Sequence, residues 1–316
     1  MAFWYNAGGY EGVVMTNRRQ FLGTAVLASA AFHSFAQAAP RTEILRRRIP
    51  SSGEMVPAIG MGTSGSFQIP ADGAEYQALK EVLKRFFEGG ATLIDTAPTY
   101  GNAEDNLGPL LAEGGYRKKA FIATKLSGVS GREAGLKQFN NTLRRLGTDQ
   151  VELLQVHNLG DWKTQIEVAR ELKKQGKVKY VGVTHYTDSA HDDIAEVVQA
   201  SKPDFLQINH SVTNRGIEDR VLPLAKDLGV AVLTNRNFND GALFGQVSGK
   251  SLPAWASEAG VTSWAQMFLK YSLSFEAVTA VIPATGKPDR QTDNLKAGFG
   301  PLLTPAQRKE LVALVG

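Results

Sequence analysis

Leu153-Leu154-Gln155-Val156-His157 is a mostly apolar run that ends on a polar residue, and the same arrangement occurs in Leu93-Ile94-Asp95 and in Phe121-Ile122-Ala123-Thr124-Lys125. Short apolar runs that are separated by helix-length segments are typical of buried parallel strands. In a closed α/β barrel the carboxyl ends of all strands open onto one face. We therefore expect Asp95, Lys125 and His157 to converge, together with Tyr100, which follows Asp95 by five positions.

The rest of the chain repeats this pattern of strand and helix. The eight runs that we interpret as strands span residues 58–63, 91–96, 120–125, 151–157, 178–184, 205–210, 230–235 and 278–283. Between them apolar residues recur every three or four positions, as in Leu79, Val82, Leu83 and Phe86, which is the spacing of an amphipathic helix. The sequence therefore predicts the α/β class and a (β/α)8 TIM barrel, preceded by a β-hairpin that turns at residues 51–54. A doubly wound sheet is the alternative, but the first strand is not followed by a G-x-G-x-x-G fingerprint in a helix-opening context.

The composition restricts the function classes. A chain of 316 residues with 43% apolar and 21% charged residues is typical of a globular protein. The net charge is only +4, and no basic stripe is interleaved with aromatic residues, so we expect no nucleic-acid partner. The absence of cysteine excludes disulfides, thiolate metal ligands and cysteine nucleophiles. No cluster of metal-ligating residues is visible in the sequence, and we predict no metal site.

The amino-terminal segment has the pattern of an export signal. Arg18-Arg19 precedes an apolar stretch rich in small residues and then Ala36-Gln37-Ala38, which fits a cleavage site before Ala39. We interpret residues 1–38 as the signal region, with residues 15–38 as the signal peptide itself, and residues 39–316 as a single barrel domain. This predicts a periplasmic or otherwise exported protein that uses the twin-arginine translocation machinery. An uncleaved anchor is the alternative, but the stretch is short for a bilayer, so no stable membrane anchor is expected.

The four converging residues can exchange a proton with an oxygen atom. A phenol titrates near pH 10 and exchanges its proton more readily when a neighbouring ammonium favours the phenolate. We expect Lys125 to supply that charge beside Tyr100, and Asp95 to hold the ammonium in place. His157 could orient a carbonyl oxygen by hydrogen bonding. Each residue also has an ordinary structural interpretation, but their joint occurrence at the strand ends favours catalysis.

From about Arg48 to Leu311 the sequence resembles the aldo-keto reductase family. The resemblance is carried by Asp95-Thr96-Ala97-Pro98-Thr99-Tyr100-Gly101, by Thr124-Lys125 and Val156-His157 at the expected spacings, and by residues 176–183. It implies that Tyr100 is the proton donor, that Lys125 and Asp95 tune it, and that His157 orients the substrate. It also implies a nicotinamide dinucleotide that lies across the carboxyl ends of the strands, with NADP(H) favoured over NAD(H).

The resemblance further implies which residues hold the cofactor. They follow the later strands and are Thr184, His185, Gln207, Asn235, Arg236, Phe238, Thr285, Lys287, Arg290, Asp293 and Asn294. Of these, Thr184, His185 and Gln207 would bind the carboxamide. Thr285 and Arg290 would bind the 2′-phosphate, and Asp293 and Asn294 would face the adenine. At two places the chain departs from the family pattern, because Asn235-Arg236-Asn237-Phe238 replaces a common Tyr-Ser-Pro-Leu and Ala284 replaces a common lysine.

These observations favour an NAD(P)(H)-dependent oxidoreductase that reduces an aldehyde, ketone or sugar-like carbonyl by hydride transfer, or oxidises the corresponding alcohol. The substrate is thus a small carbonyl compound. The alternative is a barrel of the same fold that is non-catalytic or keeps its cofactor tightly bound, and that acts in redox sensing or partner binding. The complete set of Asp, Tyr, Lys and His favours the enzyme.

Overall fold

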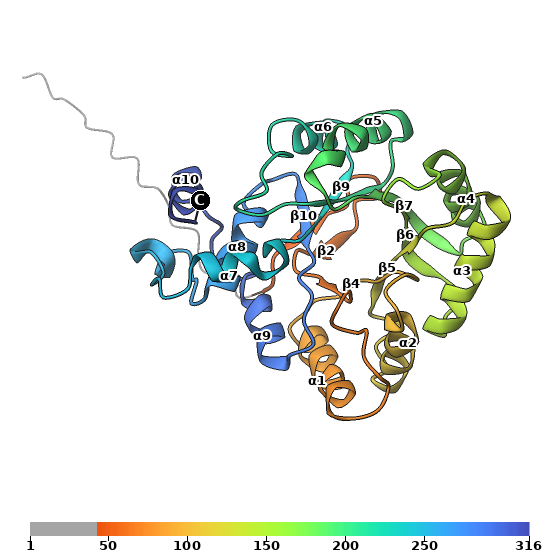
Figure 1. Ribbon diagram of the computed structural model, residues 1–316, viewed down its shortest axis with the longest axis horizontal. Helices are drawn as coiled ribbons and strands as arrows, with labels where there is room; N and C mark the ends of the chain where they lie inside the picture. The colour runs from red at the N-terminus through yellow and green to blue at the C-terminus, as the bar shows by residue number, and fades with distance from the viewer. Residues whose placement is uncertain (1–42, 316) are drawn as a thin grey trace, which may run out of the picture. The chain divides into compact units, whose positions relative to one another are not determined.

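Eight parallel strands form the central sheet of the computed structural model, which describes residues 43–315 (Figure 1). They follow one another in chain order as β3 (Met61–Gly62), β4 (Leu93–Asp95), β5 (Phe121–Leu126), β6 (Val151–His157), β7 (Val178–Thr184), β8 (Phe205–Asn209), β9 (Ala231–Asn235) and β10 (Val278–Val281). Two isolated parallel bridges, Ile59 with Val281 and Gly62 with Ala284, join the first strand region to the last. The sheet is therefore a nearly closed barrel, which confirms the predicted fold.

Helices surround the strands on the outside (Figure 1). The helices are α1 (Ala74–Glu88), α2 (Ala103–Glu113), α3 (Arg132–Leu146), α4 (Trp162–Lys174), α5 (His191–Ser201), α6 (Val221–Asp227), α7 (Ala242–Gln246), α8 (Trp264–Leu273), α9 (Pro288–Lys296) and α10 (Pro305–Val315). Short 3-10 turns lie at Asp188–Ala190, Asn239–Gly241 and Ala254–Ser257. Helix α1 buries the predicted apolar face. Helix α3 ends at Gly147, which has a φ of 61°, a value that glycine adopts without strain.

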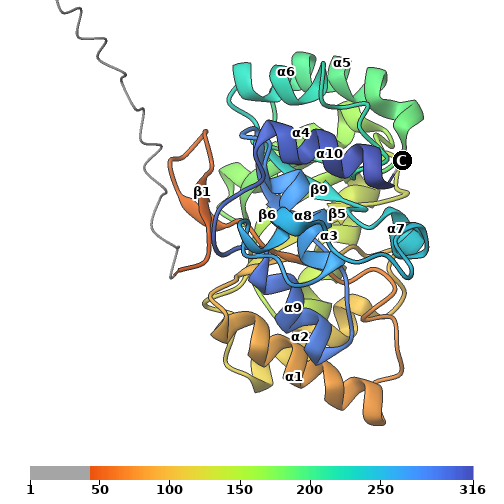
Figure 2. The same ribbon diagram turned by 90° about the vertical axis from the view of Figure 1, so that its left-hand side faces the viewer.

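The predicted hairpin is present and closes one end of the barrel. Strands β1 (Arg46–Arg48) and β2 (Met55–Pro57) pair antiparallel, and the side chains of Ile49 and Val56 join the cluster of buried residues inside the strands. The hydroxyl of Tyr180, near the start of β7, donates to Glu54 Oε2 at 2.6 Å. Figure 2 views the barrel from the side, with β1 at one end and α7, which follows β9, at the other. The opposite end is therefore left for the polar residues that follow the strands.

Several strands are shorter than the sequence suggests. The first is only Met61–Gly62 where residues 58–63 were expected, and the last ends at Val281 instead of residue 283. Pro283 has no N–H to donate to a ladder, so pairing there is restricted to single bridges. The predicted export signal, residues 1–38, lies outside the described residues. Within residues 43–315, none of the helices has the length and apolar character needed to cross a membrane.

Candidate active site

A buried ion pair lies at the carboxyl ends of β4 and β5. Asp95 is the last residue of β4, and the Lys125 side chain on the neighbouring strand donates to Asp95 Oδ1 at 2.6 Å and to the carbonyl oxygen of Thr96 at 2.8 Å. The side chain of Lys125 is 0% exposed and that of Asp95 is 4% exposed. Burial favours the neutral amine, but Asp95 and Tyr100 outweigh it and raise the pKa of Lys125 above its usual value. Lys125 is therefore an ammonium at neutral pH.

Tyr100 lies beside this ammonium on the loop that connects β4 to α2. A tight turn holds the loop, because the Tyr100 N–H donates to the carbonyl oxygen of Ala97 at 3.1 Å. Lys125 Nζ lies 4.9 Å from the centroid of the half-buried Tyr100 ring. The same ring meets the His157 imidazole edge-on, with 6.0 Å between centroids. The structure thus brings together all four residues that the sequence analysis grouped.

His157 is the last residue of β6 and carries a neutral ring. Burial, together with the charge of Lys125 and the nearby His185, lowers the pKa of His157 to about 3. A neutral imidazole has one N–H donor and one acceptor nitrogen. Its Nδ1 forms a hydrogen bond with the hydroxyl of Ser127.

Two glutamines hold the second oxygen of Asp95. The side-chain amides of Gln155 and Gln207 donate to Asp95 Oδ2 at 3.1 Å and 2.8 Å, and Gln207 also donates to Gln155 Oε1 at 3.2 Å. These donors fix the orientation of the carboxylate. Gln155 was not among the predicted site residues. The sequence position of Gln155 could have indicated that it belongs to the site. It lies two residues before His157, and alternate residues of a strand share one face.

The predicted carboxamide-binding residues form one polar group at the ends of β7, β8 and β9. Gln207 Oε1 accepts from Thr184 Oγ1 and from Asn235 Nδ2, each at 3.3 Å, and Asn235 also donates to the carbonyl oxygen of His185 at 3.1 Å. Both Thr184 and Gln207 are buried. Asn235 Oδ1 is buried and has no hydrogen-bond partner within the described residues. An unpaired buried acceptor is costly, so this atom fits a ligand that brings an N–H donor, such as a carboxamide.

Arg236 and Phe238, which follow β9, lie among aromatic side chains. The Arg236 guanidinium carbon is 4.7 Å from the centroid of the Tyr186 ring and the guanidinium pairs with Asp240 at 2.7 Å. Tyr186 in turn stacks on His185 with 5.6 Å between ring centroids. Tyr186 is 41% exposed and was not selected from the sequence. Tyr186, which follows β7, thus places an aromatic ring beside Arg236. Arg236 belongs to the segment that has Asn-Arg-Asn-Phe in place of the common Tyr-Ser-Pro-Leu.

The predicted phosphate and adenine residues lie on the segment that leads into α9. Thr285 is buried and its hydroxyl oxygen accepts the Lys287 N–H at 3.1 Å, while the side chains of Lys287 and Arg290 are exposed. The two carboxylate oxygens of Asp293 accept from Ser263 Oγ and from Gln266 Nε2, both at 2.6 Å. These bonds join α9 to the start of α8.

Asn294 is buried on the same helix, beside Asp293. Asp293 therefore lies in the contact between helices α9 and α8, whereas Lys287 and Arg290 are exposed.

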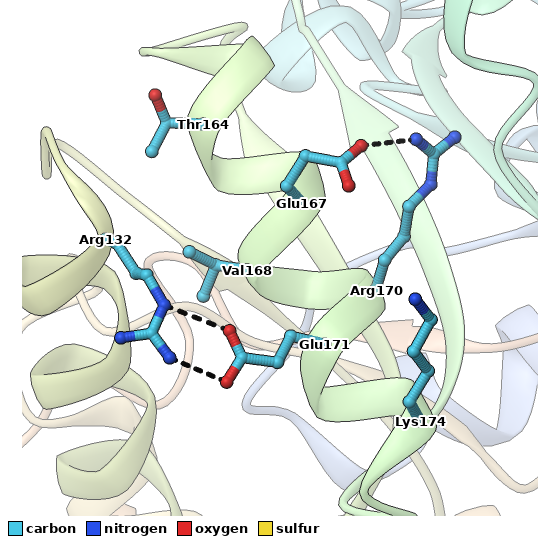
Figure 3. A pocket seen from close by; sticks show the side chains of 7 residues that line it. All are labelled: Arg132, Thr164, Glu167, Val168, Arg170, Glu171 and Lys174. Atoms are coloured by element: carbon cyan, nitrogen blue, oxygen red, sulfur yellow. Dashed lines mark hydrogen bonds and ion pairs between the residues drawn. The ribbon is translucent and has the colours of Figure 1, made fainter.

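A depression of about 330 Å³ lies on the outer surface of α3 and α4, away from these residues (Figure 3). It is lined by Arg132, Thr164, Glu167, Val168, Arg170, Glu171 and Lys174. Charged residues dominate this lining, and Arg132 forms an ion pair with Glu171 at 2.7 Å across it. None of the predicted site residues belongs to it. Over the described part of the chain, no group of three or more His, Asp and Glu side chains could hold a metal ion.

Comparison with known sequences identifies related proteins. The model of the "Aldo/keto reductase family" matches residues 58–315. The aldo-keto reductase YhdN of Bacillus subtilis is 29% identical over 214 residues, which cover 63% of this chain and 64% of the relative. The match thus spans less than two thirds of the length of that relative. The methylglyoxal reductase YeaE of Escherichia coli is 27% identical over 243 residues, which cover 75% of this chain and 84% of the relative.

Solved structures share the architecture. A thermostable aldo-keto reductase in complex with the inhibitor epalrestat superposes with a TM-score of 0.71 at 25% identity, covering 86% of this chain and all of that one. An aldo/keto reductase from Klebsiella pneumoniae in complex with NADP and acetate gives a TM-score of 0.72 at 24% identity and covers 83% of this chain and 93% of that one. The likeness extends over the barrel. Asp95, Tyr100, Lys125 and His157, which we call the tetrad, therefore lie on a fold shared by these reductases.

Proposed function

The chain belongs to the aldo/keto reductase family, and from this premise we propose that it transfers hydride between a nicotinamide dinucleotide and a carbonyl compound, with Tyr100 as proton donor. The substrate would be an aldehyde, a ketone or a sugar-like carbonyl, and the reverse reaction would oxidise the alcohol. The observation that carries the proposal is the buried Lys125–Asp95 pair beside the Tyr100 phenol.

The ammonium of Lys125 is arranged to support loss of a proton from Tyr100. Two of its three N–H donors go to Asp95 and to the carbonyl oxygen of Thr96, and its Nζ lies 4.9 Å from the centroid of the Tyr100 ring. When the phenol gives its proton to the substrate oxygen, negative charge develops on the Tyr100 oxygen. A fixed positive charge in a water-poor site stabilises that phenolate more strongly than water would.

Tyr100 is a better proton donor than His157 in this site. Because the pKa of His157 is about 3, the imidazole carries only one N–H proton at neutral pH and cannot act as an imidazolium acid. It can still donate a hydrogen bond to the substrate oxygen and hold the carbonyl beside the phenol. The two residues therefore have separate tasks, orientation for His157 and proton transfer for Tyr100.

The residues at the ends of the later strands fit a nicotinamide cofactor. The unpartnered Asn235 Oδ1 beside Gln207 and Thr184 would hold the carboxamide, and the bound dinucleotide would supply the hydride. We favour NADP(H) over NAD(H), because the exposed cations Lys287 and Arg290 flank the start of α9, where a phosphate also meets helix N–H groups. The K. pneumoniae structure with NADP supports this choice.

We also propose that the protein is exported with its signal removed at about Ala39. This rests on the sequence of residues 15–38, with Arg18-Arg19 and the Ala-x-Ala triplet. A domain that needs a cytoplasmic dinucleotide would fold around it before transport, because a ligand that binds only the folded state stabilises that state.

The experiment is an assay of the purified protein with NADPH and NADH against aldehydes, ketones and aldoses. Consumption of the reduced nucleotide that depends on the carbonyl compound is the expected result, with product alcohol formed in equal amount. Nucleotide that is released on denaturation identifies the cofactor carried by the protein. Tight nucleotide binding without turnover of any carbonyl or alcohol would favour the non-catalytic alternative and refute the proposal.

A further inference from the structure

Ser127 connects His157 to the loop that carries Tyr100. It follows β5 directly, two positions beyond Lys125, and is 6% exposed. Its hydroxyl forms hydrogen bonds with His157 Nδ1 and, at 2.8 Å, with the hydroxyl of Thr99. This serine is outside the tetrad and would not touch the substrate. It contacts the Nδ1 side of the imidazole.

A side chain from α3 fixes the position of Ser127. Gln138 Oε1 accepts the Ser127 N–H at 2.8 Å, and Gln138 Nε2 donates to the Ser127 carbonyl oxygen at 2.8 Å. A single amide thus satisfies both backbone groups of Ser127. The hydroxyl is consequently attached to a helix as well as to the loop, which limits its freedom to move away from the imidazole.

We propose that Ser127 is a positioning residue that fixes His157 in the tautomer with the proton on Nε2. The consequence for catalysis rests on the proposed function, because only that tautomer presents an N–H donor to the substrate oxygen while Nδ1 faces Ser127. The hydrogen bond at one ring nitrogen of a histidine determines which nitrogen carries the proton.

The donor arrangement follows from the chemistry of the three groups. A neutral ring nitrogen is a far better acceptor than a hydroxyl oxygen, so the Ser127 O–H donates to Nδ1 in preference to accepting from it. The Thr99 O–H then donates to the Ser127 oxygen. Thr99 is exposed, so water can complete its remaining bonds. The reverse chain would use the weaker acceptor at both steps. It would also leave His157 with a bare nitrogen toward the substrate.

The low basicity of His157 makes this selection effective. With a pKa of about 3 the ring is neutral over the physiological range, so its single proton is distributed between Nδ1 and Nε2. Without a partner at Nδ1, both tautomers become populated. The ratio of the Nε2–H to the Nδ1–H tautomer then falls about three- to tenfold, which is the effect of losing one neutral hydrogen bond.

The test is the tautomer of His157 in the free protein, measured from the nitrogen chemical shifts of protein labelled with ¹⁵N-histidine. The variants are Ser127→Ala, which removes the hydroxyl, and Ser127→Thr, which keeps it. His157→Gln identifies the resonance by its loss. His210, which bonds Glu218 at 3.0 Å, serves as an internal reference for the folded state. Ser201→Ala is the matched control, because Ser201 is also 6% exposed and its hydroxyl donates to a backbone carbonyl in α5.

We expect wild type, Ser127→Thr and Ser201→Ala to hold the proton on Nε2, and Ser127→Ala to show a mixture with unchanged His210 signals. In the reductase assay, kcat of Ser127→Ala should fall in proportion to the fraction of the Nε2–H tautomer that NMR measures, with unchanged nucleotide affinity. A wild-type proton on Nδ1, or a Ser127→Ala tautomer identical to wild type, would overturn the proposal. The NMR measurement needs neither substrate nor cofactor, so it tests the tautomer independently of the proposed activity. Failure of the proposed activity would instead appear as a wild-type protein that shows no turnover.

Discussion

Replacement of Asp95 by asparagine should destabilise the protein strongly, because it removes one partner of a buried ion pair. The Lys125 side chain is 0% exposed and its ammonium lies 2.6 Å from Asp95 Oδ1. The asparagine side chain would keep the shape of the aspartate but not its charge. Loss of one partner from such a pair costs about 3–5 kcal/mol of unfolding free energy, since the remaining charge is desolvated and unpaired.

The loss should depend on pH in a defined direction. In the wild type the pKa of Lys125 is raised, so its stabilising contribution is present below the unfolded pKa of about 10.4 and is lost as the pH rises through the folded value. In Asp95→Asn burial dominates and lowers the folded pKa of Lys125. The unfolded variant then binds a proton that the folded variant does not, so the variant gains stability as the pH rises toward 10.4. The difference in unfolding free energy between wild type and Asp95→Asn should therefore shrink from about pH 7 to about pH 10.

The assay is urea unfolding of both proteins across that range, with Asp289→Asn as control. Asp289 forms an ion pair of the same length, 2.6 Å to Arg85, but its side chain is 97% exposed. Solvent screens that pair, so the control should unfold close to wild type. Equal destabilisation by the two substitutions would refute the role given to the buried pair. A difference in unfolding free energy between Asp95→Asn and wild type that widens as the pH rises would also refute it.

Three further predictions concern the cofactor, the imidazole and the export signal. Arg290→Ala should weaken NADPH roughly ten- to hundredfold more than NADH, since one charge-assisted hydrogen bond contributes about 1.5–3 kcal/mol; equal losses in a titration with each nucleotide would argue against a phosphate contact. Because burial lowers the pKa of His157 to about 3, the neutral form persists down to that pH, and carbonyl reduction should show no inflection from this residue near pH 6.5, the ordinary histidine value; an inflection there that His157→Gln abolishes would contradict the assignment. Changing Arg18-Arg19 to Lys-Lys should leave a soluble, active precursor inside the cell, and cell fractionation that still finds mature protein in the periplasm would rule out the arginine pair as the signal.

The sequence predicts the tetrad well because one simple rule places its members. Parallel strands of a barrel present their carboxyl ends on one face, so Asp95, Lys125 and His157 had to converge once their runs were identified as strands. The periodicity of α1 similarly predicts its buried face. Strand ends were less predictable, since the two bridges that close the barrel depend on pairing between residues more than two hundred positions apart.

The surroundings of the tetrad could not be read from the same pattern. Asp293 bonds Ser263 and Gln266, which lie about thirty residues earlier, and no local pattern in the sequence indicates that contact. Ser127 is likewise not part of an apolar pattern in the sequence. Its importance comes from its contacts with His157 on the next strand and with Gln138 on a helix. Such residues are selected by tertiary contacts, which only the folded chain reveals.

The proton-donor role of Tyr100 is tested most directly by comparing Tyr100→Phe with wild type in carbonyl reduction and in nucleotide binding. Tyr116→Phe is the matched control, because the Tyr116 ring stacks on Phe87 at 4.4 Å, outside the tetrad. Proton transfer by a positioned side chain contributes roughly 10²–10⁴-fold, so Tyr100→Phe should lose at least about a hundredfold in turnover. Its nucleotide affinity should stay within about twofold of wild type, since only the hydroxyl is removed. Turnover within about twofold of wild type would contradict the account.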